Sequence, residues 1–340
     1  MISFVARELN TVYKTSTTDN VGQPPSPEVV DAAIKKGFVR LDNEIVHESV
    51  QKASKAKSKR AAVELLAPAY SGSCALLSFF DSRTNLLRVA CTGDSRAVLG
   101  RKGSSGKWIA TPLSEDQTGG TPSEIARIRQ EHPGEEYATS KGRILGQLEP
   151  SRAFGDAIYK WSRETAGYVK ATFFGRSPSP LLKTPPYVTA EPIVTTTKVD
   201  PSKGDFLVMA TDGLWECLTN EEVIGLVGQW IDSQNKGNTS GGISSWFKTQ
   251  SSNLPVENHS AKKNTGAEDG QRPPIRQDQW QIAGGDERFV VEDKNAATHL
   301  IRNALGGKDR DMVCALLSLP SPYSRRYRYV VSKPVLQSRG

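Results

Sequence analysis

Residues 74–100 read CALLSFFDSRTNLLRVACTGDSRAVLG and contain three short apolar runs separated by turn-prone residues. The first two runs, CALLSFF and LLRVAC, flank the turn-prone stretch 81–85, so antiparallel pairing is the simplest arrangement. Gly93-Asp94 precedes a third run, RAVLG, and WIATPL at 108–113 continues the alternation. Closely spaced strands joined by turns are typical of an antiparallel meander and not of a series of parallel β-α-β units.

Helical patterns lie on both sides of this meander. Apolar residues between Val30 and Ile45 recur every three or four positions after Ser26-Pro27, which predicts a long amphipathic helix. Downstream, the apolar run FLVMA (206–210) predicts a strand, and residues 219–222 have the spacing of a capping box that begins a helix. Strands and helices segregated in this way indicate an α+β domain.

The composition excludes several classes of protein. The chain has 340 residues, 37% hydrophobic and 24% charged, with a formal net charge of +7, as in a soluble globular protein. No apolar run approaches the roughly 20 residues that cross a bilayer, so we expect no membrane span. The basic residues are interleaved with acidic ones and form no recognisable nucleic-acid module, so we expect no nucleic-acid partner.

One polar segment interrupts the pattern. Residues 233–286 are dominated by Ser, Asn, Gly, Gln, Lys and Pro, and they have little apolar surface to offset the entropy cost of ordering. We predict an inserted, largely disordered loop there. Because there is no internal repeat and no second comparable core segment, we predict a single domain over residues 1–328 and a divergent tail at 329–340.

Two aspartates adjoin predicted strands. Asp212 begins an Asp-Gly dipeptide after FLVMA and Thr211, and Asp94 lies in Gly-Asp-Ser after LLRVAC. Local sequence alone favours ordinary turns at both positions. Carboxylates also suit hard divalent cations, which need several oxygen ligands, so the pair is informative only if the fold brings it together. The sequence has no G-x-S-x-G, Walker A or H-E-x-x-H motif.

The order of the motifs resembles that of the metal-dependent serine/threonine protein phosphatases of type 2C, the PPM family. Six pieces carry the resemblance: SGSCALLSFF (71–80), VACTGDSRAVLGRK (89–102), LSEDQT (113–118), GRILGQLEPSRAFGD (142–156), TAEP (189–192) and FLVMATDGLWECLTNEEVIGLV (206–227). The chain looks most like the mitochondrial pyruvate dehydrogenase phosphatase branch, on SRAFGDAIYKW (151–161) and MVCALLSLPSPYSRRYR (312–328).

The resemblance implies a PPM-type fold, a β-sandwich of two antiparallel sheets flanked by helices, with two Mg²⁺ or Mn²⁺ ions between them. In that family a water bridging the metals attacks phosphoserine or phosphothreonine. Asp212 matches the metal aspartate of the DG motif, Asp94 matches the GDS aspartate of a further, weaker metal, and we interpret Asp156 of SRAFGD as structural. The implied partner is a phosphoprotein substrate, with the pyruvate dehydrogenase complex as candidate, and the implied location is the mitochondrial matrix.

The chain departs from the family pattern at both ends. The family's Asp-Gly-His motif and phosphate-binding arginine would lie upstream of Met1, and its Asp-Asp-Ile-Thr-Val motif would stand where this chain reads YVVSKP (329–334). We therefore expect a fold that is incomplete at both ends, with unpaired sheet edges, and very weak or absent phosphatase activity. MISFVARELNTVYK (1–14) contains Glu8 and lacks the character of a transit peptide. A truncated gene model is the simplest explanation.

Three functions stay open at this point. The first is a metal-dependent protein phosphatase. The second is a non-catalytic phosphatase-like protein that binds a phosphoprotein or a regulatory subunit, against which the retained Asp94 and Asp212 count. The third is a basic nucleic-acid binder, suggested by net charge alone, whose binding would fall steeply with salt. It ranks last.

Overall fold

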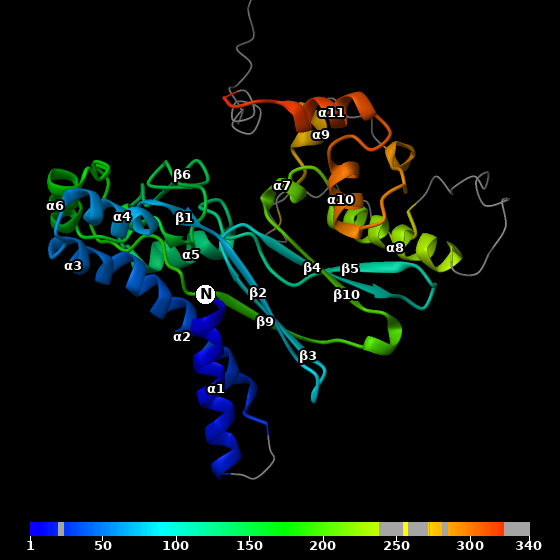
Figure 1. Cartoon of the computed structure of the whole chain (residues 1–340), viewed down its shortest axis with the longest axis horizontal. Coiled ribbons are helices and arrows are strands. Elements are labelled where there is room, and N and C mark those ends of the chain that lie inside the picture. The colour runs from blue at the N-terminus through cyan, green and yellow to red at the C-terminus, as the bar shows by residue number, and fades with distance from the viewer. Residues whose placement is uncertain (20–23, 238–253, 258–270, 272, 281–284, 323–340) are drawn as a thin grey trace, which may run out of the picture.

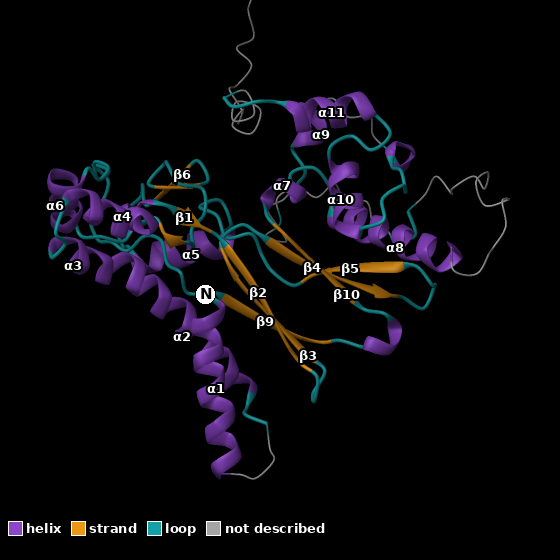
Figure 2. Cartoon of the chain, viewed as in Figure 1, coloured by secondary structure: helices purple, strands orange, loops and turns teal. Residues whose placement is uncertain are grey.

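Two antiparallel three-stranded sheets form the centre of the molecule, and helices cover their outer faces (Figures 1 and 2). The computed structural model describes residues 1–19, 24–237, 254–257, 271, 273–280 and 285–322. The first sheet has the order β2 (Ala75–Asp81), β3 (Leu86–Thr92), β9 (Ile193–Lys198). The second has the order β10 (Phe206–Ala210), β4 (Arg96–Lys102), β5 (Trp108–Pro112). The predicted α+β sandwich is confirmed.

The remaining elements surround this centre. Two small ribbons pair β1 (Gly72–Ser73) with β8 (Phe154–Gly155) and β6 (Thr139–Ser140) with β7 (Arg143–Ile144). The helices are α1 (Ile2–Asp19), α2 (Pro27–Asn43), α3 (Ser49–Ser54), α4 (Lys59–Tyr70), α5 (Pro122–Glu131), α6 (Arg163–Phe173), α7 (Asp212–Trp215), α8 (Asn220–Gly237), α9 (Arg276–Gln279), α10 (Ala296–Ala304) and α11 (Arg310–Ser318). A π-helical turn at Glu44–Glu48 joins α2 to α3. Within the described residues no helix is long and apolar enough to cross a membrane.

The predicted meander is divided between the two sheets. β2 pairs with β3 and β4 pairs with β5, both antiparallel, as the sequence predicts. The Gly93-Asp94-Ser95 connection carries the chain from the first sheet to the second, so β3 and β4 belong to different sheets. Gly93 has a φ of +105°, and a Cβ there would lie 2.3 Å from the Cys74 Sγ, so this crossing requires glycine.

Apolar side chains between the sheets hold the two layers together. Val89 from the first sheet and Ala97 and Leu99 from the second are buried in one cluster with Leu87 and Leu113. Alternate residues of a strand point to opposite faces, so the other faces of both sheets need helical cover. α1 and α2 cover the first sheet, and α8 and α10 cover the second.

The helix start at α8 forms as predicted. Thr219 Oγ1 accepts from the Glu222 amide at 3.1 Å, while the Glu222 carboxylate accepts from the Thr219 amide at 2.9 Å. The similar sequence at Thr121 forms no such box, because the Glu124 side chain turns towards two arginines instead. Capping spacing alone does not reveal a competing charged partner.

Glu124 is the centre of a buried network that fixes the loop before β8. Its carboxylate accepts hydrogen bonds from Arg127 at 2.8 Å, from Arg152 at 2.8 Å and from Ser151 Oγ at 2.6 Å, and the residue is 1% exposed. Burial raises the pKa of Glu124, but hydrogen bonds and charge from the two arginines outweigh it and lower the pKa to about 2. Folding therefore favours the ionised form.

Parts of the predicted insertion are attached to the core. α8 continues to Gly237, Leu254 and Val256 are buried against α8 and β5, and Arg276 is 6% exposed. The sequence interpretation overlooked these contacts because isolated apolar residues in a polar segment carry no periodic pattern. Residues 238–253, 258–270, 272 and 281–284 and the tail at 329–340 lie outside the described residues, so the predicted domain limits stay a prediction.

Replacing Glu124 tests the network. Glu124→Gln removes a buried charge opposite two arginines and is expected to cost on the order of 3 kcal/mol of unfolding free energy at pH 7. Because the folded pKa lies below the ordinary value of 4.5, the stabilisation is complete above that pH and is lost as the pH falls towards about 2. Urea denaturation of both proteins at pH 7 and pH 3 measures this.

Glu64→Gln is the matched control, since Glu64 pairs with Arg60 on the exposed side of α4. Its effect is expected to stay below about 0.5 kcal/mol. Equal losses for the two variants would contradict a special role for the buried carboxylate.

Candidate functional site

The pairing of β4 with β10 brings the two predicted aspartates together. The register places Ala210 opposite Arg96. Asp212 comes two residues after Ala210, and Asp94 comes two residues before Arg96, so both lie beyond the same end of this strand pair. They come from segments far apart in the sequence, yet they line one cavity. The fold thus brings Asp94 and Asp212 to one place, which a shared cation site would require.

The cavity is strongly acidic. Four carboxylates, those of Asp94, Asp116, Asp212 and Glu216, line it together with one arginine, Arg96. Asp94 is 9% exposed, whereas Asp212, the first residue of α7, is exposed. A group of like charges around one cavity is unfavourable unless cations or hydrogen-bond donors offset it.

Arg96 offsets one of these charges. Its guanidinium donates to both oxygens of Asp116, at 3.0 and 2.6 Å, and to Asn220 Oδ1 at 2.9 Å, and it lies over the Trp215 ring at 5.1 Å. Arg96 and Asp116 are each 2% exposed. This bidentate buried pair joins β4, the loop after β5, and the start of α8, so it shapes the wall of the cavity.

Arg276 offsets a second charge. It is the first residue of α9, and its guanidinium lies 2.7 Å from Glu216 Oε2. The Arg276 amide also donates to the Glu216 carbonyl oxygen at 2.8 Å. Two of the four acidic side chains are therefore held by arginines of this chain.

Asp94 has a neighbouring thiol. The Cys74 Sγ donates to Asp94 Oδ1 at 3.2 Å, from the residue just before β2. Burial is the main reason that the pKa of the Cys74 thiol is raised well above its ordinary value, and the charge of Asp94 adds to it. The thiol is thus a hydrogen-bond donor at neutral pH and orients the Asp94 carboxylate.

These residues alone do not make a two-metal centre. Such a centre needs several oxygen ligands for each ion. Among the residues that the structure describes, no group of three or more His, Cys, Asp or Glu side chains is arranged to hold a metal ion. Asp116 and Glu216 are ion-paired with arginines, so the described side chains do not fit a two-metal centre.

Comparison with known proteins identifies the family. The sequence pattern of the family described as Protein phosphatase 2C matches residues 4–245. The chain belongs to the protein phosphatase 2C family. A protein phosphatase 2C homolog of Schizosaccharomyces pombe is 42% identical over 99% of this chain and 68% of its own length.

Two further relatives have more specific names. The mitochondrial [pyruvate dehydrogenase [acetyl-transferring]]-phosphatase 1 of Saccharomyces cerevisiae is 42% identical over 96% of the chain, and its human counterpart is 32% identical over 97%. The chain spans 56% and 58% of the lengths of these two relatives. A serine-threonine phosphatase 2C structure from Toxoplasma gondii overlaps with a TM-score of 0.42 at 17% identity, covering 68% of this chain and 71% of that one.

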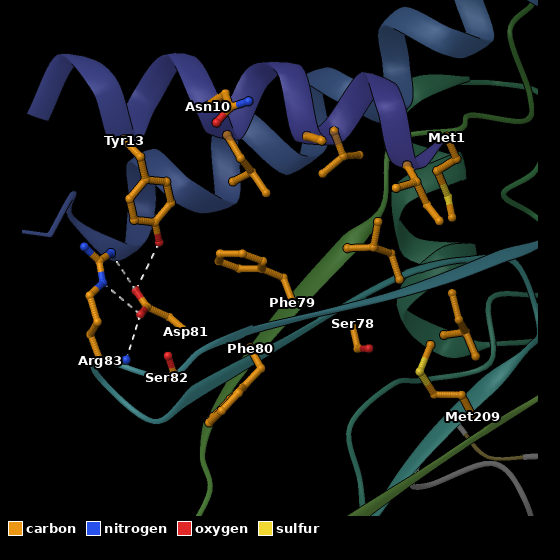
Figure 3. Close-up of a pocket in the computed structure, with 16 residues that line it drawn as sticks. Met1, Asn10, Tyr13, Ser78, Phe79, Phe80, Asp81, Ser82, Arg83 and Met209 are labelled. Atoms are coloured by element: carbon orange, nitrogen blue, oxygen red, sulfur yellow. Dashed lines mark hydrogen bonds and ion pairs between the residues drawn. The ribbon is translucent and has the colours of Figure 1, made fainter.

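A second, larger cavity of this phosphatase 2C chain has a different character. It has a volume of about 700 Å³ and lies between α1 and β2, lined mostly by apolar side chains (Figure 3). β2 is an edge strand of the first sheet. The Asp81 carboxylate in this cavity accepts a hydrogen bond from Tyr13 at 3.1 Å and another from Arg83.

Sequence reasoning missed half of the acidic cavity of this phosphatase 2C chain. Asp116 lies in the quoted motif LSEDQT and Glu216 lies in the quoted motif around Asp212, but neither was assigned a role. Arg276 lies in the range 233–286, which the sequence predicts to be a loop. Asp156, interpreted as structural, does not line the acidic cavity; it has a φ of 45°, and burial raises the pKa of its carboxyl.

Stability measurements distinguish a carboxylate that the fold needs, that of Asp116, from an exposed one that it does not need, that of Asp212. Asp116→Asn leaves the buried Arg96 without its charge partner and is expected to cost about 3 kcal/mol or more of unfolding free energy. Asp212→Asn changes an exposed residue and should stay within about 0.5 kcal/mol. Urea denaturation at pH 7 measures both, and a large loss for Asp212→Asn would show that its carboxylate is needed for folding.

Proposed function

We propose that this chain acts in the metal-dependent hydrolysis of phosphoserine or phosphothreonine in proteins, and that Asp212 and Asp94 contribute carboxylate ligands to Mg²⁺ or Mn²⁺. The observation that carries the proposal is the β4–β10 register, which brings these two aspartates to one cavity. Membership of the phosphatase 2C family supports the reaction class. The names of two relatives, both mitochondrial pyruvate dehydrogenase phosphatases, support pyruvate dehydrogenase as substrate and the mitochondrion as location.

The charge of the cavity supports a cation requirement. Four carboxylates line the cavity, and arginines hold two of them, those of Asp116 and Glu216. A phosphate monoester is itself an anion and would be repelled by this surface. A bound divalent cation reverses the local sign and makes phosphate binding favourable.

The small number of proposed metal ligands supports weak phosphatase activity for the chain by itself. Asp94 and Asp212 are two carboxylates, whereas a pair of hydrated divalent ions needs a larger set of fixed oxygen ligands. We expect one ion to bind weakly and turnover to be very slow. The chain spans between about half and two thirds of the length of these relatives, so this expectation concerns the 340-residue chain alone.

One observation favours a second function, that of a non-catalytic binding protein. Arginines of this chain hold Asp116 and Glu216, which keeps two cavity carboxylates from a metal. A protein of this type would bind a phosphoprotein without hydrolysing it.

Titration calorimetry with MnCl₂ tests the metal proposal. Asp212→Asn is expected to weaken Mn²⁺ binding by about tenfold or more, because one of two charged ligands is lost. Asp200→Asn removes the same charge beyond the other end of β10 and should leave the affinity unchanged. Equal affinity in wild type and Asp212→Asn would contradict the assignment.

Phosphate release from a phosphoserine peptide, with and without MnCl₂, separates the two functions. Slow, Mn²⁺-dependent release that Asp212→Asn abolishes supports the enzyme. Saturable peptide binding without release at any Mn²⁺ concentration supports the binding protein. Rapid release by the 340-residue chain would contradict our expectation of weak activity.

A further inference from the structure

Two strand edges border the apolar cavity between α1 and β2. Among the described residues, β2 pairs only with β3, and β10 pairs only with β4, so each has one edge that no strand covers. Met209 of β10 lines the cavity together with Leu76 and Ser78 of β2, so the two edges lie on the same side of the sandwich (Figure 3). The backbone N–H and C=O groups along such an edge can pair with another strand.

The other two edge strands are protected against pairing, whereas β2 and β10 are not. β9 contains three threonines and ends at Lys198, and β5 ends at Pro112 and is bridged by Val256. Lysine, proline and a covering loop are the usual protections of a sheet edge. Residues 75–80 of β2 and 206–210 of β10 include no charged residue and no proline. The cavity therefore opens beside the two edges that lack these protections.

Large apolar side chains are exposed at this opening. Phe80 is 44% exposed, Met209 is 37% exposed and Ile2 of α1 is 75% exposed, and all three line the cavity of about 700 Å³. Single exposed apolar residues are ordinary on a protein surface, but a contiguous group beside an open cavity indicates an interaction site. We call β2, Met209 and Ile2 together the open edge.

The sequence of β2 is complementary to a second copy of itself. Residues directly opposite each other in an antiparallel pair share a face of the sheet, and a two-fold axis through the pair preserves these faces. An axis at Ser78, the middle residue of β2, sets this serine opposite its own copy. Leu77 then lies opposite Phe79 of the second copy. Leu76 likewise lies opposite Phe80 of the second copy, so aliphatic side chains meet aromatic ones and no like charges meet.

A second copy suits this edge better than a flexible peptide does. β2 is already ordered along its whole length by pairing with β3, so joining two copies of it orders no new strand. A flexible peptide would lose its conformational freedom on binding, which lowers its affinity. The pairing also closes at two copies, because each copy uses its β2 edge and the far edge of the sheet, β9, ends at Lys198.

We propose that the open edge is a homodimer interface, in which β2 pairs antiparallel with β2 of a second copy about an axis at Ser78. The pairing joins the first sheets of the two copies into one continuous sheet and covers Phe80 and Met209. The proposal depends neither on phosphatase activity nor on metal binding, so it can fail or succeed independently of the proposed function.

Sedimentation velocity of the full chain over a range of protein concentrations tests the interface. Ser78→Lys sets two like charges on the axis, and Phe80→Lys sets a charge against Leu76 of the second copy. Both positions are exposed, and circular dichroism checks that each variant is folded. Thr196→Lys is the matched control, because it adds the same charge at an exposed position of the β9 edge. Hydrogen exchange of residues 75–81 at low and high concentration locates the contact.

We expect wild type and Thr196→Lys to double in mass as the concentration rises, with slower exchange of residues 75–81 in the dimer. Each β2 variant should raise the dimer dissociation constant about tenfold or more. A wild type that stays monomeric would overturn the proposal, and so would a dimer that both β2 variants leave unchanged. Monomeric wild type whose residues 75–81 are protected only by an added synthetic peptide of that sequence would assign the edge to extended peptides and overturn the dimer.

Discussion

The antiparallel pairing of β4 with β10 is the constraint on which the rest of this structure depends. Backbone hydrogen bonds fix its register, and the register determines which residues meet beyond its end. A slip of one residue would exchange the two buried faces of β4, which pack against different clusters, and would also shift Asp94 relative to Asp212. The site is thus defined by the same bonds that build the second sheet.

Buried ion pairs then hold the irregular segments against this frame. Arg96 with Asp116, Glu124 with Arg152, and Lys160 with Asp42 each join a loop or helix start to a distant part of the chain. Such pairs add little net stability compared with apolar residues of the same shape, but removing one partner is costly. Their contribution is therefore to select one arrangement of the loops.

Much of the fold could be predicted from the sequence, because many of its helices and strands are indicated by local sequence patterns. The strands around Asp81 and Asn85, the helix after Ser26-Pro27 and the capping box at Thr219 all depend on neighbours within a few positions. The division of the meander into two sheets depends on long-range packing that no local pattern reports. Asp116 and Arg276 were missed for the same reason, since each gains its role from a partner at least 20 positions away.

The crossing at Gly93-Asp94-Ser95 has a mechanical consequence. Asp94 is attached to the second sheet through β4, and Asp212 is attached to the same sheet through β10. The two sheets contact each other through apolar side chains and not through a shared strand ladder. Cys74 stands directly before β2 of the first sheet and donates to Asp94, so a small rotation of that sheet, for instance when another polypeptide presses on α1, would act on Asp94 and not on Asp212. Strain in that half of the sandwich therefore reaches the acidic cavity through one of its carboxylates.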